Sequence, residues 1–143
     1  MIRLGLIDVG RVMAPLLVAL ALPADAQAPQ MSLQALDRLE AGSWRIEAEG
    51  QEPRTMCLSD PAALTQVVHE GPACRRFVIA NEVRSATVHY SCAAAGWGRT
   101  TVQIDNPRQV QIRTQGIKGR APFDFTAEAR WTGACGAAPA GRR

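Results

Sequence analysis

The 143-residue chain has few of the residue types that usually mark a function. Aromatic residues make up only 5% of it, histidine occurs twice, and Lys118 is the single lysine among 16 basic residues. The net charge is a mild +3, and the arginines are scattered along the chain. Because nucleic-acid-binding proteins usually concentrate basic residues in one stripe, we expect no nucleic-acid partner.

The motifs of common catalytic sites are also missing. A serine hydrolase usually carries its nucleophile in a Gly-x-Ser-x-Gly turn, which does not occur here. His69 is predicted to lie in a loop and His89 on a polar strand face, and we expect both to be solvated. Glu47 and Glu128 could form a carboxylate pair of the kind that hydrolyses glycosides. Both, however, fall on the outward parity of their strands, where charge is expected anyway.

Two glycine-rich segments are predicted to be loops. Gly96-Trp97-Gly98 either presents Trp97 to a partner or lets the ring fold back over an open end of the sheet. Residues 116–122 form a longer loop that begins Gly-Ile-Lys-Gly. This sequence is too short for a phosphate-binding loop and lacks the strand–loop–helix setting, so it is interpreted as a hairpin connection.

Residues 1–26 have the three parts of a secretory signal. Arg3 and Arg11 supply positive charge, residues 12–22 are mostly apolar, and Ala24-Asp25-Ala26 matches a signal-peptidase site. The apolar stretch is about half of the roughly 20 residues that span a bilayer, so no transmembrane anchor is expected. We therefore predict cleavage after Ala26 and export to the periplasm or the medium. The alternative is an apolar helix that stays attached.

Four cysteines remain in the exported part: Cys57, Cys74, Cys92 and Cys135. An even number of cysteines in a short exported chain is typical of a disulfide framework. Zinc sites usually draw their ligands from closely spaced pairs, and no two cysteines here are that close. We predict two disulfides, no metal and no cofactor.

Residues 27–135 are predicted to form one domain, followed by a disordered basic tail at 136–143. Apolar and polar residues alternate with a period of two in most of the predicted strands, which is typical of half-buried strands. Residues 32–39 and 60–68 are predicted helices, the second with Asp60 as its cap and Pro61 at its first position. The seven predicted strands are 44–49, 55–58, 76–80, 86–91, 100–105, 109–113 and 123–131.

The predicted fold class is mainly β with one or two short helices (α+β). Its antiparallel β meander forms a curved sheet or a small barrel, stapled by disulfides. The interior of such a sheet can hold a small apolar ligand. Its own inward-facing rings would otherwise fill that space: Trp44, Phe77, Phe123, Phe125 and Trp131.

The spacing of the cysteines and tryptophans also carries a family resemblance. Gly42-x-Trp44 follows the signal, Cys57 and Cys74 flank a helix, Cys92 closes a strand, and Arg130-Trp131-x-Gly133-x-Cys135 ends the pattern. The chain resembles the exported bacterial proteins grouped as domain of unknown function family 3617. It departs from them in its short stretch between Trp44 and Cys57. The resemblance implies an envelope location and a fold, and no activity.

Strand parity predicts the disulfide pairing Cys57–Cys74 and Cys92–Cys135. Cys92 and Cys135 continue inward-facing rows of their strands, whereas Cys57 and Cys74 face away from those rows. The parity of Cys74 assumes that Phe77 and Ile79 point inward and Val78 does not.

These observations favour a binding or envelope-associated module over the alternative, an enzyme with an unrecognised active site. The candidate partners are an envelope protein or a small apolar ligand.

Overall fold

The computed structural model describes residues 32–70 and 74–136. The predicted signal at 1–26 and nearly all of the predicted tail lie outside the described residues. Within these two segments, seven strands and three short 3-10 turns follow one another. The turns are η1 (Leu36–Arg38), η2 (Pro61–Gln66) and η3 (Ala93–Ala95), and the strands are β1 (Gly42–Ala48), β2 (Arg54–Leu58), β3 (Arg75–Asn81), β4 (Ser85–Ser91), β5 (Gly96–Asn106), β6 (Gln109–Lys118) and β7 (Ala121–Gly133).

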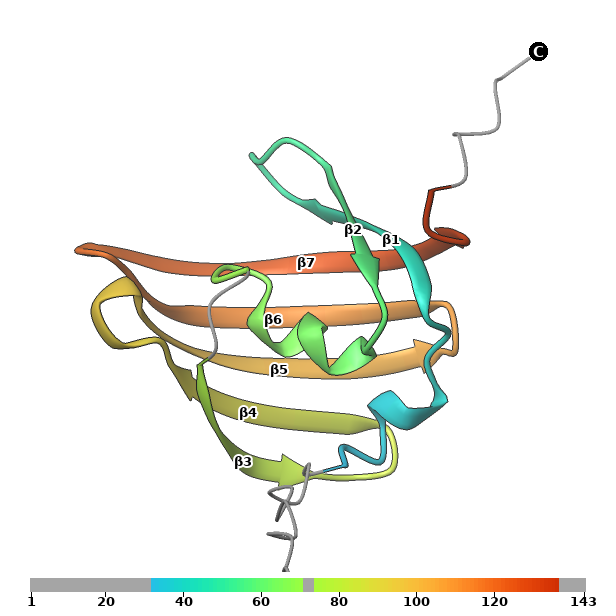
Figure 1. Ribbon diagram of the computed structural model, residues 1–143, viewed down its shortest axis with the longest axis horizontal. Helices are drawn as coiled ribbons and strands as arrows, with labels where there is room; N and C mark the ends of the chain where they lie inside the picture. The colour runs from blue at the N-terminus through green and yellow to red at the C-terminus, as the bar shows by residue number, and fades with distance from the viewer. Residues whose placement is uncertain (1–31, 71–73, 137–143) are drawn as a thin grey trace, which may run out of the picture. The chain divides into compact units, whose positions relative to one another are not determined.

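All seven strands belong to one antiparallel sheet in the order β2-β1-β7-β6-β5-β4-β3 (Figure 1). The order ends on β2 and β3, so the sheet is open rather than closed into a barrel. The predicted fold class is confirmed, with the curved sheet as the form it takes.

The two predicted helices are 3-10 turns. Asp60 caps η2 as predicted, because its Oδ1 accepts a hydrogen bond from the backbone N–H of Ala62 at 2.9 Å, and Pro61 begins the turn. The Thr65 hydroxyl donates to the carbonyl of Ala62 at 2.8 Å. Segments this short rarely pay the cost of nucleating an α-helix, and 3-10 geometry is common in them. In the part of the chain that the structure describes, no helix is long and apolar enough to cross a membrane.

One face of the sheet, called here the inner face, is covered by η1 and η2 (Figure 1). Trp44 is fully buried there, and its indole N–H donates to the carbonyl of Glu40 at 2.8 Å. Leu64 and Val67 from the η2 segment are fully buried against the sheet, so the chain itself occupies much of this face. The strand residues of the same core are Trp44, Ile46, Leu58, Ala86, Val88, Val102, Ile104, Val110, Ile112, Ala127 and Ala129.

Gly96-Trp97-Gly98, predicted as a loop, lies in strand β5. The segment 116–122 contains a hairpin connection, as interpreted from the sequence, but most of it belongs to strands β6 and β7. Gly98 of β5 lies directly opposite Gly116 of β6, and the connection between β6 and β7 is only residues 119–120. A Cβ on Gly98 would lie 2.3 Å from the Tyr90 hydroxyl. Glycine is therefore needed at position 98 because the Tyr90 ring lies against the backbone there. At position 116 a Cβ would come within 2.1 Å of the Trp97 carbonyl oxygen, so both glycines mark close approaches within the sheet and not breaks in it.

The disulfides join Cys57 to Cys135 and Cys74 to Cys92, so the predicted pairing Cys57–Cys74 and Cys92–Cys135 is wrong. Arg75 pairs with Ser91 across β3 and β4, and the next step of that register brings Cys74 opposite Cys92, with 4.4 Å between Cα atoms.

The other disulfide follows from the position of β1 between β2 and β7. Ser43 pairs with Cys57 on one side and with Gly133 on the other. The residues just after Gly133 bring Cys135 to Cys57, with 5.4 Å between Cα atoms.

The assumed parity of β3 is also wrong. Val78 packs against the core, whereas Phe77 and Ile79 are 55% and 54% exposed on the opposite, outer face. The disulfide at Cys74 and the pairing of Val78 with the buried Val88 hold β3 in this register.

Candidate functional site

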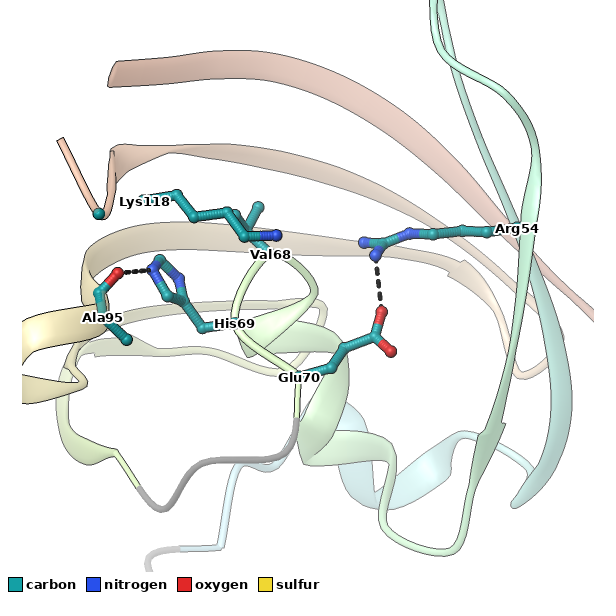
Figure 2. A pocket seen from close by; sticks show the side chains of 7 residues that line it. Arg54, Val68, His69, Glu70, Ala95 and Lys118 are labelled. Carbon is teal, nitrogen blue, oxygen red and sulfur yellow. Dashed lines mark hydrogen bonds and ion pairs between the residues drawn. The ribbon is translucent and has the colours of Figure 1, made fainter. Parts of the chain in front are cut away.

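A pocket of about 540 Å³ opens at one end of the inner face (Figure 2). Its walls come from β2, the loop after η2, η3, and the end of β6 with the turn that follows. The lining residues are Arg54, Val68, His69, Glu70, Ala95, Lys118 and Gly119.

His69 forms the most enclosed part of the wall, at 4% exposure. Its Nε2 lies 2.9 Å from the carbonyl oxygen of Ala95, and its Nδ1 lies 3.1 Å from the Tyr90 hydroxyl. A carbonyl only accepts, so we assign the proton to Nε2, and Nδ1 then accepts from the hydroxyl of Tyr90. The prediction that His69 is solvated is wrong, because both ring nitrogens have protein partners that satisfy them without water.

The imidazole fits into a gap left by small residues and rings. Its ring meets Tyr90 edge-on at 5.4 Å between centroids and lies 6.1 Å from Phe123. A Cβ on Gly96 would come within 3.1 Å of Nε2. Burial raises the pKa of Tyr90 to about 12, so its hydroxyl stays protonated and able to donate to His69.

The Ala95 carbonyl fixes the base of the pocket. It accepts from His69 and also from the backbone N–H of Gly119 at 2.8 Å. One oxygen therefore ties the loop after η2 to the turn between β6 and β7. A wall built from these residues holds its shape without a ligand.

Arg54 reaches the pocket from the edge strand β2. Its Nη1 donates to Glu70 at 2.6 Å, and its Nη2 donates to the carbonyl of Val67. A guanidinium has five N–H donors, so three remain beyond these two contacts. The ion pair is about half exposed, which leaves it open to competition from an incoming anion.

Lys118 enters from the opposite side. It is the last residue of β6, and its side chain extends across the pocket towards Arg54 (Figure 2). Within residues 32–70 and 74–136, no carboxylate forms an ion pair with its ammonium group. Two cations therefore converge on one space that holds a single acid, Glu70.

This arrangement suits binding an anion better than proton transfer. Carboxylates and phosphates are recognised by guanidinium and ammonium donors arranged in this way. The imidazole has no free nitrogen to act as a base unless it gives up a bond to Ala95 or Tyr90.

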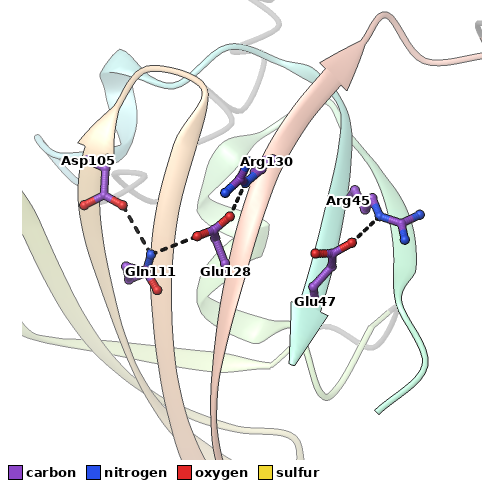
Figure 3. A network of polar contacts seen from close by, with 6 residues as sticks. All are labelled: Arg45, Glu47, Asp105, Gln111, Glu128 and Arg130. Atoms are coloured by element: carbon purple, nitrogen blue, oxygen red, sulfur yellow. Dashed lines mark hydrogen bonds and ion pairs between the residues drawn. The ribbon is translucent and has the colours of Figure 1, made fainter. Parts of the chain in front are cut away.

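The predicted carboxylate pair lies elsewhere, on the outer face. Both residues face outward as predicted, and Glu47 of β1 lies directly opposite Glu128 of β7. Each pairs with an arginine two residues away on its own strand, Arg45 at 2.5 Å for Glu47 and Arg130 for Glu128 (Figure 3). The hydrogen bond from Arg130 lowers the pKa of Glu128. A glycosidase acid needs a raised pKa, and the lowered pKa of Glu128 does not fit that role.

The second histidine and the loop tryptophan also lie on the outer face. His89 is there as predicted, but its ring is flanked by Phe77 and Trp97, at 6.4 and 5.6 Å between centroids. Trp97 is a residue of strand β5, 39% exposed beside His89, and does not fold over an open end of the sheet.

Sequence reasoning missed the pocket because its residues come from four separate segments. No pattern singles out Arg54, and Lys118 stands out only as the one lysine. Among the described residues, no cluster of three or more His, Cys, Asp or Glu side chains is arranged to hold a metal ion.

Comparisons of the chain with protein-family models, curated proteins and solved structures found no match.

Proposed function

We propose that the chain is an exported binding module that holds a small anionic ligand in the pocket between Arg54 and Lys118. The observation that carries this proposal is the convergence of two cationic side chains, one without an ion-pair partner in the described structure, on a preformed pocket. Membership of domain of unknown function family 3617 is part of the same proposal and rests on the cysteine and tryptophan spacing.

Export is supported by two independent features. The N-terminal sequence has a basic, apolar and small-x-small order. All four cysteines are joined in disulfides, which persist mainly in oxidising compartments such as the periplasm. The ligand is accordingly one that occurs in the periplasm or outside the cell.

The residues of the pocket define the ligand class. An anionic group lies between the ammonium of Lys118 and the free N–H groups of Arg54. Glu70 is the adjacent acceptor, so a hydroxyl or amine next to the anionic group has a partner. A small carboxylate or phosphate compound with such a neighbour fits better than a purely apolar ligand.

The test is an NMR titration of the disulfide-bonded protein with inorganic phosphate and, separately, with succinate. We expect saturable shifts of the backbone amides of Glu70, Lys118 and Gly119 with at least one of them. K118Q removes the unpaired cation and should abolish those shifts.

R120Q is the matched control, because Arg120 lies two residues from Lys118 and outside the pocket lining. It should leave the titration unchanged. Equal weakening by R120Q, or shifts that never saturate with either anion, would show only diffuse attraction of anions and refute the site.

A further inference from the structure

The outer face of β3, β4 and β5 carries a row of three rings, of which Phe77 and Trp97 are exposed and His89 is half-buried between them. Phe77 lies opposite His89, which is flanked in turn by Trp97, so three rings follow one another across three strands. Ile79, two residues along β3 from Phe77, adds an aliphatic side chain that is 54% exposed. Exposed apolar residues gathered in this way mark a contact surface more often than scattered ones do.

Arginines interleave with these rings. The sheet register places Arg75 opposite Ser91 and Arg99 opposite His89. No ion pair involves Arg75 or Arg99 within the described segments. Asp105 is the only acid on the outward parity of β3, β4 and β5, and it lies six residues along β5 from Arg99, or about 20 Å.

We propose that this surface, the ring–arginine surface (Arg75, Phe77, Ile79, His89, Trp97 and Arg99), docks on an anionic lipid membrane. Arginines near a negatively charged leaflet and aromatic rings at headgroup depth are the two elements of peripheral membrane binding. The surface is on the face opposite η1 and η2, whereas the pocket opens on the inner face. The docked protein therefore keeps its pocket accessible.

The same observations disfavour other partners. If two copies docked through this surface, the unpaired Arg75 and Arg99 of one copy would face those of the other, and like charges repel. Single-stranded nucleic acid stacks on aromatic rings, but it makes no comparable contact with the exposed aliphatic side chain of Ile79. An apolar membrane interface accommodates rings, aliphatic side chains and arginines together.

The experiment is vesicle flotation with the disulfide-bonded protein. The probes are vesicles of phosphatidylglycerol and phosphatidylcholine in equal parts, vesicles of phosphatidylcholine alone, and a single-stranded oligonucleotide. We expect binding to the anionic vesicles only. R75Q/R99Q should lower the partition constant about 30-fold, or about fivefold for each arginine. F77T/W97T should also release the protein.

R45Q/R130Q is the matched control, because it removes the same charge from the same face at β1 and β7. These strands are about 10–14 Å from β5, at or beyond the screening length in about 0.1 M salt, so its effect should be much smaller. Melting temperatures of all variants show that they fold.

Three outcomes overturn the proposal. An equal loss with R45Q/R130Q would mean that only net charge matters. Unchanged binding by F77T/W97T would exclude the rings, and comparable binding of the oligonucleotide would assign the surface to nucleic acid.

Discussion

The two edges of the sheet are built differently. At the β2 edge, the disulfide Cys57–Cys135 joins residues 78 positions apart, and the neighbouring outer face of β1 and β7 holds its charges in Arg–Glu pairs. At the β3 edge, Cys74–Cys92 spans only 18 positions within one hairpin, and the outer face exposes rings and unpaired arginines.

The difference suggests that the β2 side mainly stabilises the domain and that the β3 side provides a contact surface. The β2 side carries Trp44, the largest fully buried side chain, and the connection that closes most of the domain. The β3 side leaves apolar side chains in contact with water, which is unfavourable for the free energy of folding. A surface that a small domain leaves uncovered in this way is available for a partner.

The strongest test of the comparison is removal of the long-range disulfide. C57S/C135S should lower the free energy of unfolding by about 4.5 kcal/mol, because the chain-entropy cost grows with the length of the closed loop. Urea melts measure the loss. A change of less than about 1 kcal/mol would mean that the β2 edge does not hold the domain together.

The hairpin disulfide should matter less. The Cys74–Cys92 disulfide closes a shorter loop, so the same estimate predicts that C74S/C92S lowers the free energy of unfolding by about 3 kcal/mol. Non-reducing peptide mapping of the parent protein should recover Cys57 linked to Cys135 and Cys74 linked to Cys92. If C74S/C92S is the more damaging variant, the assignment of stability to the β2 side is wrong.

The pairing shows where sequence reasoning reaches its limit. Period-two alternation located five of the seven strands, and Asp60-Pro61 located the start of η2, because both signals are local. Alternation leaves open which strands become neighbours. The β1 strand pairs with β7 as well as with β2, and only that long-range pairing brings Cys135 to Cys57.

The pocket was unpredictable for the same reason. His69 carries no local sign of burial, and its partners Tyr90 and Ala95 lie 21 and 26 residues away. Gly98 looks like a loop residue until the Tyr90 ring is placed against it, and Gly116 until the backbone of Trp97 on the neighbouring strand is placed against it. The predicted turn at 81–82 would place Cys74 opposite His89, three residues from Cys92, so the register of the β3–β4 hairpin could not be predicted from the sequence either.

Alkaline pH should loosen the β3 side selectively through Tyr90. Its pKa is raised by burial from 10.0 to about 12, so the folded state holds a proton that the unfolded chain has lost in that range. Stability is therefore complete below about pH 10 and falls between pH 10 and 12, by roughly 2 kcal/mol.

The chain has a single tyrosine, so the absorbance of tyrosinate reports this group alone. Its titration should have a midpoint near 12 in the folded protein. Y90F should remove the pH dependence of urea melts in this window. A midpoint near the ordinary value would show that the hydroxyl is not enclosed beside His69.

The smallest expected change in stability concerns the outer face of β1 and β7, where the charges are held in Arg–Glu pairs. Glu128 accepts hydrogen bonds from Arg130 and from Gln111, and the arginine is the larger cause of its lowered pKa. R130Q should raise the pKa of the Glu128 carboxyl towards its ordinary range, as followed by the NMR shift of its side-chain carbon.

The stability linked to this group is present above the pKa of an unfolded glutamate and is lost as pH falls through the lower folded pKa. Because the Arg130 side chain is mostly exposed and that of Glu128 is partly exposed, E128Q should change the free energy of unfolding at neutral pH by less than about 0.5 kcal/mol. A loss of several kcal/mol in E128Q would show that these surface charges hold β1 to β7, and the stability of the β2 side would then depend on its ion pairs as well as on its disulfide and buried Trp44.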